Sequence, residues 1–303
     1  MRALVATGNA SAPLELREVD EPTTAPSEVV IAPKNVSINR GELRLVTTRA
    51  AGWRPGQDVA GVVEREAADG SGPKKGARVV ALVDQAGWSE RVAAPVSRVA
   101  LLPDNVSFAQ AATLPVAGLT ALRALRLGGM LLGKRVLITG ATGGVGQIAV
   151  QLAVRSGAQV VGTARNPERG TLGNVQLTSD ISTLQGTFDV ILESVGGESL
   201  TTSLKLVGRD GIVVLFGNSA AQDSSVSFAS FGGKAHAKLY AFFVYESGEP
   251  PTFGADLGVL ANEIGTGHLQ PQVGLEASWR DPLGALNALR ERRMEGKAVL
   301  AID

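Results

Sequence analysis

The chain has 303 residues, with 29 basic and 29 acidic side chains that leave no formal net charge. This length predicts two domains, and the balanced charge argues against nucleic acid or an anionic membrane as the main partner. There is no cysteine, which excludes disulfides, thiol nucleophiles and cysteine-ligated zinc or iron–sulfur sites.

The apolar stretches are short and interrupted by Gly, Arg or Lys, whereas a membrane-spanning helix needs roughly 20 apolar residues. The first residues, M-R-A-L-V-A-T-G, lack the long apolar region of a secretory signal. We therefore expect a cytoplasmic protein with no membrane partner.

The first part of the chain consists of short β-forming runs separated by turns. Strands are expected at residues 29–32, 59–63 and 77–83. The segments between them are rich in Pro, Gly and Asp. Such a succession of short strands is typical of a small β-barrel or sandwich.

The pattern changes near residue 115, where strands begin to alternate with helices. Apolar residues recur at helical spacing from residue 110 to 127. Further strands are expected at 135–139, 159–163, 188–192, 211–216 and 239–244, with a helix at 145–155. This alternation predicts an α/β fold with a doubly wound parallel sheet. After residue 250, helices are expected at 255–264 and 282–292, and a final strand at 298–302.

A glycine-rich turn follows the first of these buried strands, in the run V-L-I-T-G-A-T-G-G-V-G at residues 136–146. Small residues allow the backbone to approach a pyrophosphate, and the start of a helix offers free N–H groups and a positive dipole end. The spacing of Gly140, Gly143 and Gly146 departs from G-x-G-x-x-G, and a tight strand-to-helix turn is the alternative. The surrounding strands and helix favour a dinucleotide site.

The end of the second strand indicates which dinucleotide is bound. NAD sites usually place Asp or Glu there to hold the ribose 2′-hydroxyl, but residues 162–166 read G-T-A-R-N. Arg165 is placed to meet a 2′-phosphate with a charge-assisted fork; the alternative is a solvated surface arginine. We predict NADPH as the cofactor.

Several motifs in order resemble the medium-chain dehydrogenase/reductase superfamily, and within it the zinc-free quinone oxidoreductase (zeta-crystallin-like) branch. They are V-S-I-N at 36–39, P-G-Q-D-V-A-G at 55–61, A-T-L-P-V-A-G-L-T-A at 112–121, the glycine motif with Q-I-A-V-Q-L-A at 147–153, E-S-V-G-G at 193–197 and G-K-A-V-L at 296–300. The resemblance implies a GroES-like β-rich catalytic domain of residues 1–116 and 249–303. It also implies a Rossmann NADP-binding domain of residues 117–248, with the cofactor in the cleft between the two and a homodimer formed through the last sheet strand.

The same resemblance implies the site residues. Asn39 and Thr120 match positions at the nicotinamide end and are the nearest candidates for a catalytic role, which is otherwise unassigned. The other implied cofactor-binding residues are Gly143, Gly144 and Val145 at the pyrophosphate, Thr163 and Arg165 at the 2′-phosphate, Val195, Gly217 and Asn218 at the ribose and carboxamide, and Phe243 on the last sheet strand. An Asx-turn is the alternative role for Asn39.

We expect no metal. Zinc-dependent relatives carry Gly-His-Glu where this chain has G-Q-D at 56–58, and His236 and His268 are the only histidines. A catalytic zinc usually has three protein ligands, and Asp58 and Glu64 form no cluster with ligand spacing.

The chemistry that remains is hydride transfer to a conjugated acceptor. Neither Tyr240 nor Tyr245 begins a Tyr-x-x-x-Lys motif. A quinone or α,β-unsaturated carbonyl needs little help, because charge spreads over an enolate or phenolate that a few aimed hydrogen-bond donors stabilise. We expect these donors to come from the backbone, Asn39, Thr120 or the cofactor ribose. We therefore predict an NADPH-dependent quinone or enone reductase. The alternatives are an enoyl-thioester reductase of lipid or polyketide synthesis and a non-catalytic NADPH-binding protein with a regulatory or structural role.

Overall fold

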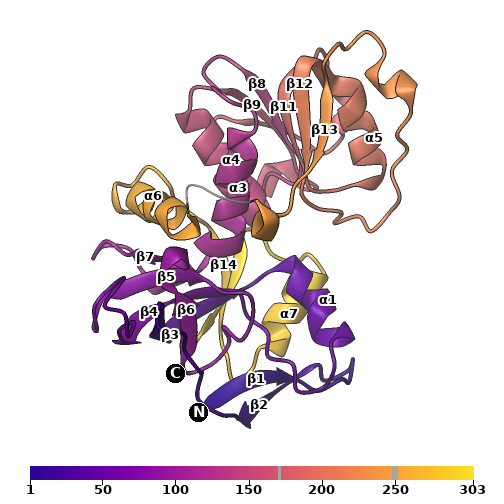
Figure 1. Cartoon of the computed structure of the whole chain (residues 1–303). Helices are drawn as coiled ribbons and strands as arrows, with labels where there is room; N and C mark the ends of the chain where they lie inside the picture. The colour runs from indigo at the N-terminus through magenta and orange to yellow at the C-terminus, as the bar shows by residue number, and fades with distance from the viewer. Residues whose placement is uncertain (170–171, 248–251) are drawn as a thin grey trace. The chain divides into compact units, whose positions relative to one another are not determined.

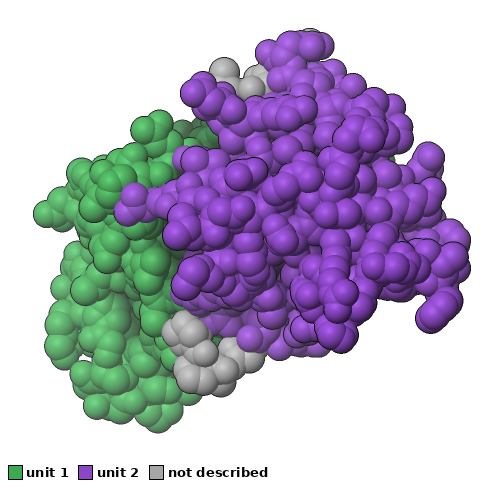
Figure 2. Space-filling view, turned by 90° about the horizontal axis from the view of Figure 1, so that it is seen from above, with its two compact units in different colours: residues 1–119, 249–303 green, residues 120–248 purple. Residues whose placement is uncertain are grey.

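The computed structural model describes residues 1–169, 172–247 and 252–303. Two compact units make up the chain. Unit 1 consists of Met1–Leu119 and Glu249–Asp303, and unit 2 of Thr120–Gly248; Figure 2 colours them green and purple. Among the described residues, no helix combines the length and apolar character needed to cross a bilayer.

Unit 2 is built on a six-stranded sheet in which every pair of neighbours is parallel. Its strands are β8 (Arg135–Ile138), β9 (Gln159–Thr163), β10 (Gln176–Thr178), β11 (Phe188–Glu193), β12 (Val207–Leu215) and β13 (Lys238–Ala241). Their order across the sheet is β10-β9-β8-β11-β12-β13. Counted along the chain this is the doubly wound order 3-2-1-4-5-6, so the predicted α/β fold is confirmed.

Helices cover the sheet of unit 2 because its central strands are apolar on both faces. Helix α4 (Gly144–Arg155) packs on β8 and β9, and α5 (Gly197–Leu206) packs on β11 and β12 (Figure 1). Leu200 and Leu204 of α5 lie in one core with Phe188 and Val213 of the sheet. The strand order reverses at β8, the point where such sheets bind ligands at the carboxyl ends of their strands.

The connection from β9 to β10 is short. It contains a 3₁₀ turn at Pro167–Arg169, and its described residues include no α-helix. A second 3₁₀ turn, Ile181–Thr183, lies between β10 and β11.

Unit 1 is rich in β-structure, as predicted. A seven-stranded sheet has the order β14-β15-β3-β4-β5-β7, with β6 also paired to β3, and β1 and β2 form a separate antiparallel pair. The strands are β1 (Arg2–Ala6), β2 (Leu14–Glu18), β3 (Glu28–Ile38), β4 (Asp58–Arg65), β5 (Arg78–Leu82), β6 (Val92–Pro95), β7 (Val99–Leu101), β14 (Val273–Ser278) and β15 (Lys297–Ala301). The helices are α1 (Arg40–Thr48), α2 (Phe108–Ala112), α6 (Phe253–Gly265) and α7 (Leu283–Arg290).

Two segments far apart in sequence meet in the middle of this sheet. Strand β15 pairs antiparallel with β3, so that Ala298 lies opposite Ile38. Beneath them the core contains two fully buried tryptophans, Trp88 and Trp279. The C-terminal part of the chain therefore completes the domain that the N-terminal part begins.

The helix predicted at residues 110–127 is interrupted. After α2 the chain forms one π-helical turn at Leu114–Gly118 and then continues as α3 (Leu119–Arg126). Pro115 lies inside this turn, where it has no N–H to donate to a helical ladder. Such π-turns are frequent at functional sites.

The last strand of the unit 2 sheet is shorter than predicted. Strand β13 ends at Ala241, and the chain turns into a 3₁₀ segment at Val244–Glu246. Phe243 precedes that segment as its N-cap. Its predicted location on the last strand is wrong.

Candidate functional site

The glycine turn follows β8, and α4 begins directly behind it. Gly143 is the exposed N-cap of α4, and Gly144 and Val145 are its half-buried first residues. The first N–H groups of an α-helix have no partner within the helix. A Cβ on Gly146 would lie 2.2 Å from the Gly140 carbonyl oxygen. Glycine is required at this position because the helix and the turn approach so closely. The close approach places the N-terminus of α4 next to the carboxyl end of β8.

The turn is joined to the end of β9. The N–H of Ala141 donates to the carbonyl oxygen of Thr163 at 2.8 Å. Thr163 is buried, whereas Arg165, two residues on, is exposed. Arg165 is the second residue after β9, and residues 162–166 contain no Asp or Glu. The bond joins this segment to the turn that leads into α4, and anions are favoured at a helix N-terminus.

A buried carboxylate organises the loop that follows β11. Glu193 is fully buried, and its Oε1 accepts the N–H groups of Val195 and Gly196 at 2.7 and 2.9 Å. Its Oε2 accepts the hydroxyls of Ser199 and Ser203 at 3.0 and 2.8 Å. Four donors hold this one side chain, so the loop and the start of α5 are fixed together.

The loop after β12 is attached to the loop after β11. Ser219 donates its N–H to the Ser194 carbonyl at 3.0 Å, and Ala220 donates to the Val195 carbonyl at 2.8 Å. A Cβ on Gly217 would lie 2.9 Å from the Ser194 oxygen, so glycine permits this approach. The Asn218 side chain bonds to the backbone of Gln222 and would contact any Cβ on Gly196.

Seven predicted cofactor residues thus gather at the carboxyl edge of one sheet. They are Gly143, Gly144, Val145, Thr163, Val195, Gly217 and Asn218, and Arg165 follows directly after β9. Thr120 is in α3 and is 5% exposed. Phe243 follows β13 and is 64% exposed.

Asn39 lies in unit 1, at the N-cap of α1, and its side chain is held from both sides. Lys297 Nζ donates to Asn39 Oδ1 at 2.5 Å. Asn39 Nδ2 donates to Asp58 Oδ2 at 2.9 Å and faces Glu42 Oε2 at 3.4 Å. Both amide hydrogens are directed at carboxyl oxygens, so the predicted use of Asn39 as a donor to an enolate is not supported. The amide oxygen Oδ1 can only accept.

Asp58 and Lys297 form a buried ion pair behind Asn39. Lys297 Nζ lies 3.0 Å from Asp58 Oδ2, and the two side chains are 4% and 0% exposed. Asp58 also accepts from the Ser37 hydroxyl and, through Oδ1, from the N–H of Val116 in the π-turn at 2.8 Å. Lys297 donates to the Ile38 carbonyl as well. This network connects β3, β4, β15 and the π-turn.

Glu42 is the second buried carboxylate of this cluster. It accepts the N–H of Asn39 at 2.8 Å and the N–H of Gly56 at 3.1 Å. Burial is the main cause that raises the pKa of Glu42 to about 8, and the nearby Asp58 charge adds to the shift. Protonation of Glu42 leaves the cluster neutral, with Asp58 balanced by Lys297.

Sequence reasoning missed the cluster of Glu42, Asp58 and Lys297, and also Glu193. Asp58 was considered only as a metal ligand, and Glu42 was assigned no role. A signal was present for Lys297 and Glu193, because each is a charged residue in an otherwise apolar run. Such residues are almost never fully buried without partners.

No group of three or more His, Asp or Glu side chains is gathered as for a metal ion within residues 1–169, 172–247 and 252–303. His236 is exposed and bonds to Asp210 at 2.8 Å. His268 is exposed and bonds to Thr266 at 2.9 Å.

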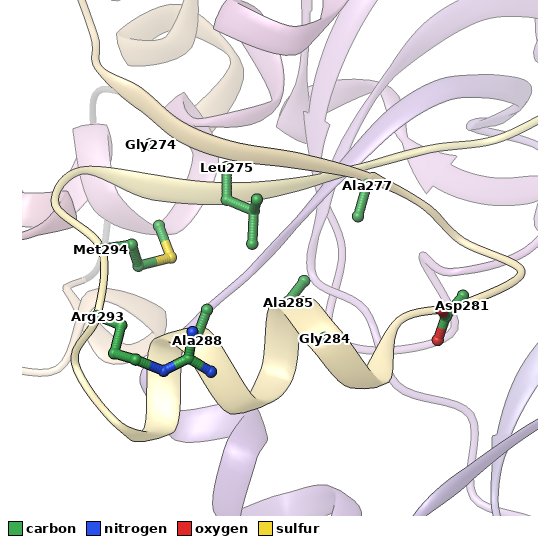
Figure 3. Close-up of a pocket in the computed structure, with 9 residues that line it drawn as sticks. All are labelled: Gly274, Leu275, Ala277, Asp281, Gly284, Ala285, Ala288, Arg293 and Met294. Atoms are coloured by element: carbon green, nitrogen blue, oxygen red, sulfur yellow. The ribbon is translucent and has the colours of Figure 1, made fainter.

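A pocket of about 400 Å³ lies elsewhere in unit 1, between β14 and α7. Figure 3 shows Leu275 and Ala277 of the strand facing Ala285 and Ala288 of the helix, with Met294 closing one end. None of the predicted site residues lines this pocket.

A parallel sheet in the order 3-2-1-4-5-6, with a glycine turn after its first strand, defines the dinucleotide-binding Rossmann class. Residues 144–258 match the family model described as zinc-binding dehydrogenase. The quinone oxidoreductase of Thermus thermophilus, whose structure includes an NADPH complex, is 29% identical. It superposes with a TM-score of 0.83 over 99% of this chain and 100% of its own. The Pseudomonas syringae quinone oxidoreductase is 26% identical, with a TM-score of 0.86 and 99% coverage of both chains.

The chain belongs to the medium-chain dehydrogenase/reductase superfamily. Curated relatives include NorB, a spectinabilin polyketide synthase system protein of Streptomyces orinoci, which is 31% identical over 92% of this chain. This chain spans only 13% of the length of NorB. The 2-methylene-furan-3-one reductase of Solanum lycopersicum is 33% identical over 53% of this chain and 46% of its own length.

Proposed function

We propose that this chain is an NADPH-dependent reductase that transfers hydride to a quinone or an α,β-unsaturated carbonyl without a metal. The observation that carries the proposal is the carboxyl edge of the unit 2 sheet. There a glycine turn, the end of β9 and the two joined loops after β11 and β12 lie together.

The residues present fit a phosphorylated dinucleotide. Gly143 is exposed at the start of a 12-residue helix, and the close contacts at Gly146 and Gly217 leave no room for side chains. The start of α4 would hold the pyrophosphate through its N–H groups. Arg165 would pair with the 2′-phosphate, because a guanidinium offers a fork of donors to phosphate oxygens.

Bound NADPH would supply the hydride. The chain's own contribution is to hold the dinucleotide along the strand ends and to present fixed hydrogen-bonding groups to it. Asn39, Thr120 and Phe243 are proposed to lie at its nicotinamide side. Asn39 offers an acceptor there, so we assign it no role as a proton donor.

The test follows NADPH oxidation at 340 nm with a panel of quinones, enones and enoyl thioesters, with NADH in parallel. Calorimetry measures NADPH binding separately. We expect turnover of at least one conjugated acceptor and a preference for NADPH over NADH. Absence of NADPH binding would contradict the proposal, whereas tight binding without turnover would favour a non-catalytic role.

A second candidate is an enoyl-thioester reductase. The matches to polyketide synthases, such as the 31% identity to NorB over 92% of this chain, favour it. Both candidates transfer hydride to a conjugated carbonyl system. They differ in the acceptor, because an enoyl thioester carries sulfur on its carbonyl carbon whereas a quinone or enone does not. Turnover of an enoyl thioester at a higher kcat/KM than any quinone would identify this activity.

We also propose a homodimer that forms through β13. This strand is one of the two edge strands of the sheet, and its Tyr240 is 47% exposed. Unpaired strand edges are usually covered.

A further inference from the structure

The cluster behind Asn39 contains more charge than a structural role alone requires. Its three charged residues are almost completely buried, with 0% of Asp58 and Glu42 and 4% of Lys297 exposed. A buried ion pair is weak evidence for stability, because desolvation of both charges offsets their attraction. Apolar residues of similar size could fill the same space. We therefore look for the role of the Asp58–Lys297 pair in the groups that these two side chains contact.

Those contacts converge on the carboxamide of Asn39. Lys297 Nζ donates to its oxygen at 2.5 Å, and Asp58 accepts from its nitrogen at 2.9 Å. An ammonium can only donate and an ionised carboxylate can only accept. The amide can satisfy both partners in one orientation only, because a flip would set its NH₂ against Lys297 and its oxygen against Asp58.

The partners of Asn39 are themselves held in place. Asp58 accepts from the Val116 N–H at 2.8 Å and from the Ser37 hydroxyl. Lys297 extends from β15, the strand hydrogen-bonded to β3 beside it, and also donates to the Ile38 carbonyl at 3.2 Å. The orientation of one half-buried amide is therefore determined by residues of three strands, β3, β4 and β15, and by the π-turn.

We propose that Lys297 and Asp58 are positioning residues for Asn39. They hold its carboxamide so that the oxygen is presented, as an acceptor only, to an N–H or O–H donor of the bound cofactor or substrate. This inference rests on the proposed function, since it assumes that Asn39 faces the bound molecules. The inference adds two points to that function: the Asn39 amide recognises a hydrogen-bond donor, and Lys297 and Asp58 hold the amide in the orientation that does so.

The first experiment measures the orientation of Asn39 without any turnover. Side-chain amide protons of Asn39 are observed by NMR in protein labelled with ¹⁵N-asparagine. Lys297→Met keeps the length of the side chain and removes its charge. Since it leaves the buried Asp58 without its counter-ion, the double variant Lys297→Met/Asp58→Asn is measured beside it as a neutral cluster. We expect the two Asn39 amide protons to exchange with solvent at least tenfold faster in both variants.

The matched control is Lys75→Met, the same substitution at an exposed lysine of unit 1. It is expected to leave the Asn39 amide signals unchanged. Unchanged Asn39 exchange in the double variant would overturn the positioning role. This arm gives an answer even if the wild-type chain binds no NADPH, so its failure and the failure of the proposed function are distinguishable.

The second experiment measures what the oriented amide does. We expect kcat to fall about 10- to 100-fold in the double variant, because small misplacement of a positioned group costs about this much. The affinity for 2′,5′-ADP, which carries no nicotinamide, should stay within twofold of wild type. A purely structural defect would weaken both. Wild-type kcat in a double variant that binds 2′,5′-ADP normally would refute the proposal.

A cofactor analogue identifies the donor. In the 3-acetylpyridine analogue of NADPH a methyl group replaces the carboxamide NH₂. If Asn39 accepts from that NH₂, the wild-type protein uses the analogue less efficiently than NADPH, whereas the double variant uses the two cofactors equally well. If Asn39 accepts from the substrate, both proteins discriminate equally and the variant shows a raised KM for the acceptor. Equal discrimination together with an unchanged KM would count against both sources and overturn the proposal.

Discussion

The N–H of Ala141 donates to the carbonyl oxygen of Thr163 at 2.8 Å, which joins the glycine turn after β8 to the end of β9. This bond brings the segment that contains Arg165 beside the N-terminus of α4. The pyrophosphate and the 2′-phosphate of one dinucleotide could therefore be recognised by adjoining groups of unit 2.

Arg165→Ala should reduce the preference for NADPH. A hydrogen bond between charged groups contributes about 1.5–3 kcal/mol, so kcat/KM for NADPH should fall about 10- to 100-fold, while kcat/KM for NADH stays within twofold. The control is Arg209→Ala, which removes an exposed arginine near the start of β12. An unchanged ratio of the two kcat/KM values would show that Arg165 is a solvated surface residue.

Gly146→Ala should destabilise the chain and weaken NADPH binding. The new Cβ would lie 2.2 Å from the Gly140 oxygen and 2.8 Å from Ala141 Cα, and relief of such overlaps costs about 1–3 kcal/mol. Urea unfolding and calorimetry measure the two effects. Gly258→Ala is the matched control inside α6, where the nearest contact would be an ordinary 3.9 Å. That substitution should be neutral or stabilising by up to about 1 kcal/mol.

Glu193→Leu should raise the Kd for NADPH. It leaves the N–H groups of Val195 and Gly196 without their acceptor, at a cost of about 1–3 kcal/mol, so a Kd increase of about tenfold or more is expected. Glu193→Gln is the conservative comparison. Its amide oxygen can accept both N–H groups, and the two serine hydroxyls can rotate to accept from its nitrogen. If Gln and Leu variants lose equal affinity, hydrogen bonding by Glu193 does not hold the loop.

Glu42 should make stability fall as pH rises. Burial raises its pKa from 4.5 to about 8. Between these values the folded chain retains a proton that the unfolded chain has released, so its contribution is fully present below pH 4.5 and is lost as pH rises through about 8. The slope is at most about 1.4 kcal/mol per pH unit.

Urea unfolding of wild type and Glu42→Gln from pH 5 to 9 measures this contribution. The variant loses one of the backbone hydrogen bonds to Asn39 or Gly56, and so is less stable at low pH. The stability difference between the two proteins should shrink steadily as pH rises towards 8. A difference that is constant across this range would show that Glu42 is ionised in the folded chain.

The proposed dimer predicts a particle of twice the 31.2 kDa chain mass by light scattering at micromolar concentration. Tyr240→Lys places a charge on the edge strand and should shift the mass towards that of one chain, since charged side chains block strand pairing. Val154→Lys, at an exposed apolar position of α4, is the control. A monomeric wild type would refute this dimer.

The fold could be read from the sequence where local pattern and tertiary environment agree. The apolar runs at β8, β11 and β12 include consecutive buried residues and so are buried on both faces, and their composition alone indicated a parallel sheet. Prediction was less accurate at β13, where an apolar run continues past the strand through Phe242 and Val244. Both side chains are buried in the segment after the strand ends, and periodicity cannot distinguish these two uses of apolar residues.

The site was predictable only in part for a related reason. The glycine turn is local, so its residues could be named from their spacing. The orientation of Asn39 depends on Lys297, which is 258 residues away, and no pattern within one segment reports such a contact. Asn39 was therefore assigned as a donor, although its surroundings leave it only an acceptor.

The pairing of β15 with β3 also constrains when the chain can fold during synthesis. Unit 2 is one uninterrupted stretch of chain, whereas unit 1 requires strands from both sides of it. As a ribosome releases the chain, unit 2 can therefore complete its sheet before β15 has paired with β3. At that stage Asp58 also lacks its ammonium partner, Lys297. The charged cluster can close only after the strand that contains Lys297 has emerged, so unit 1 matures after unit 2 although its first 119 residues are synthesised before it.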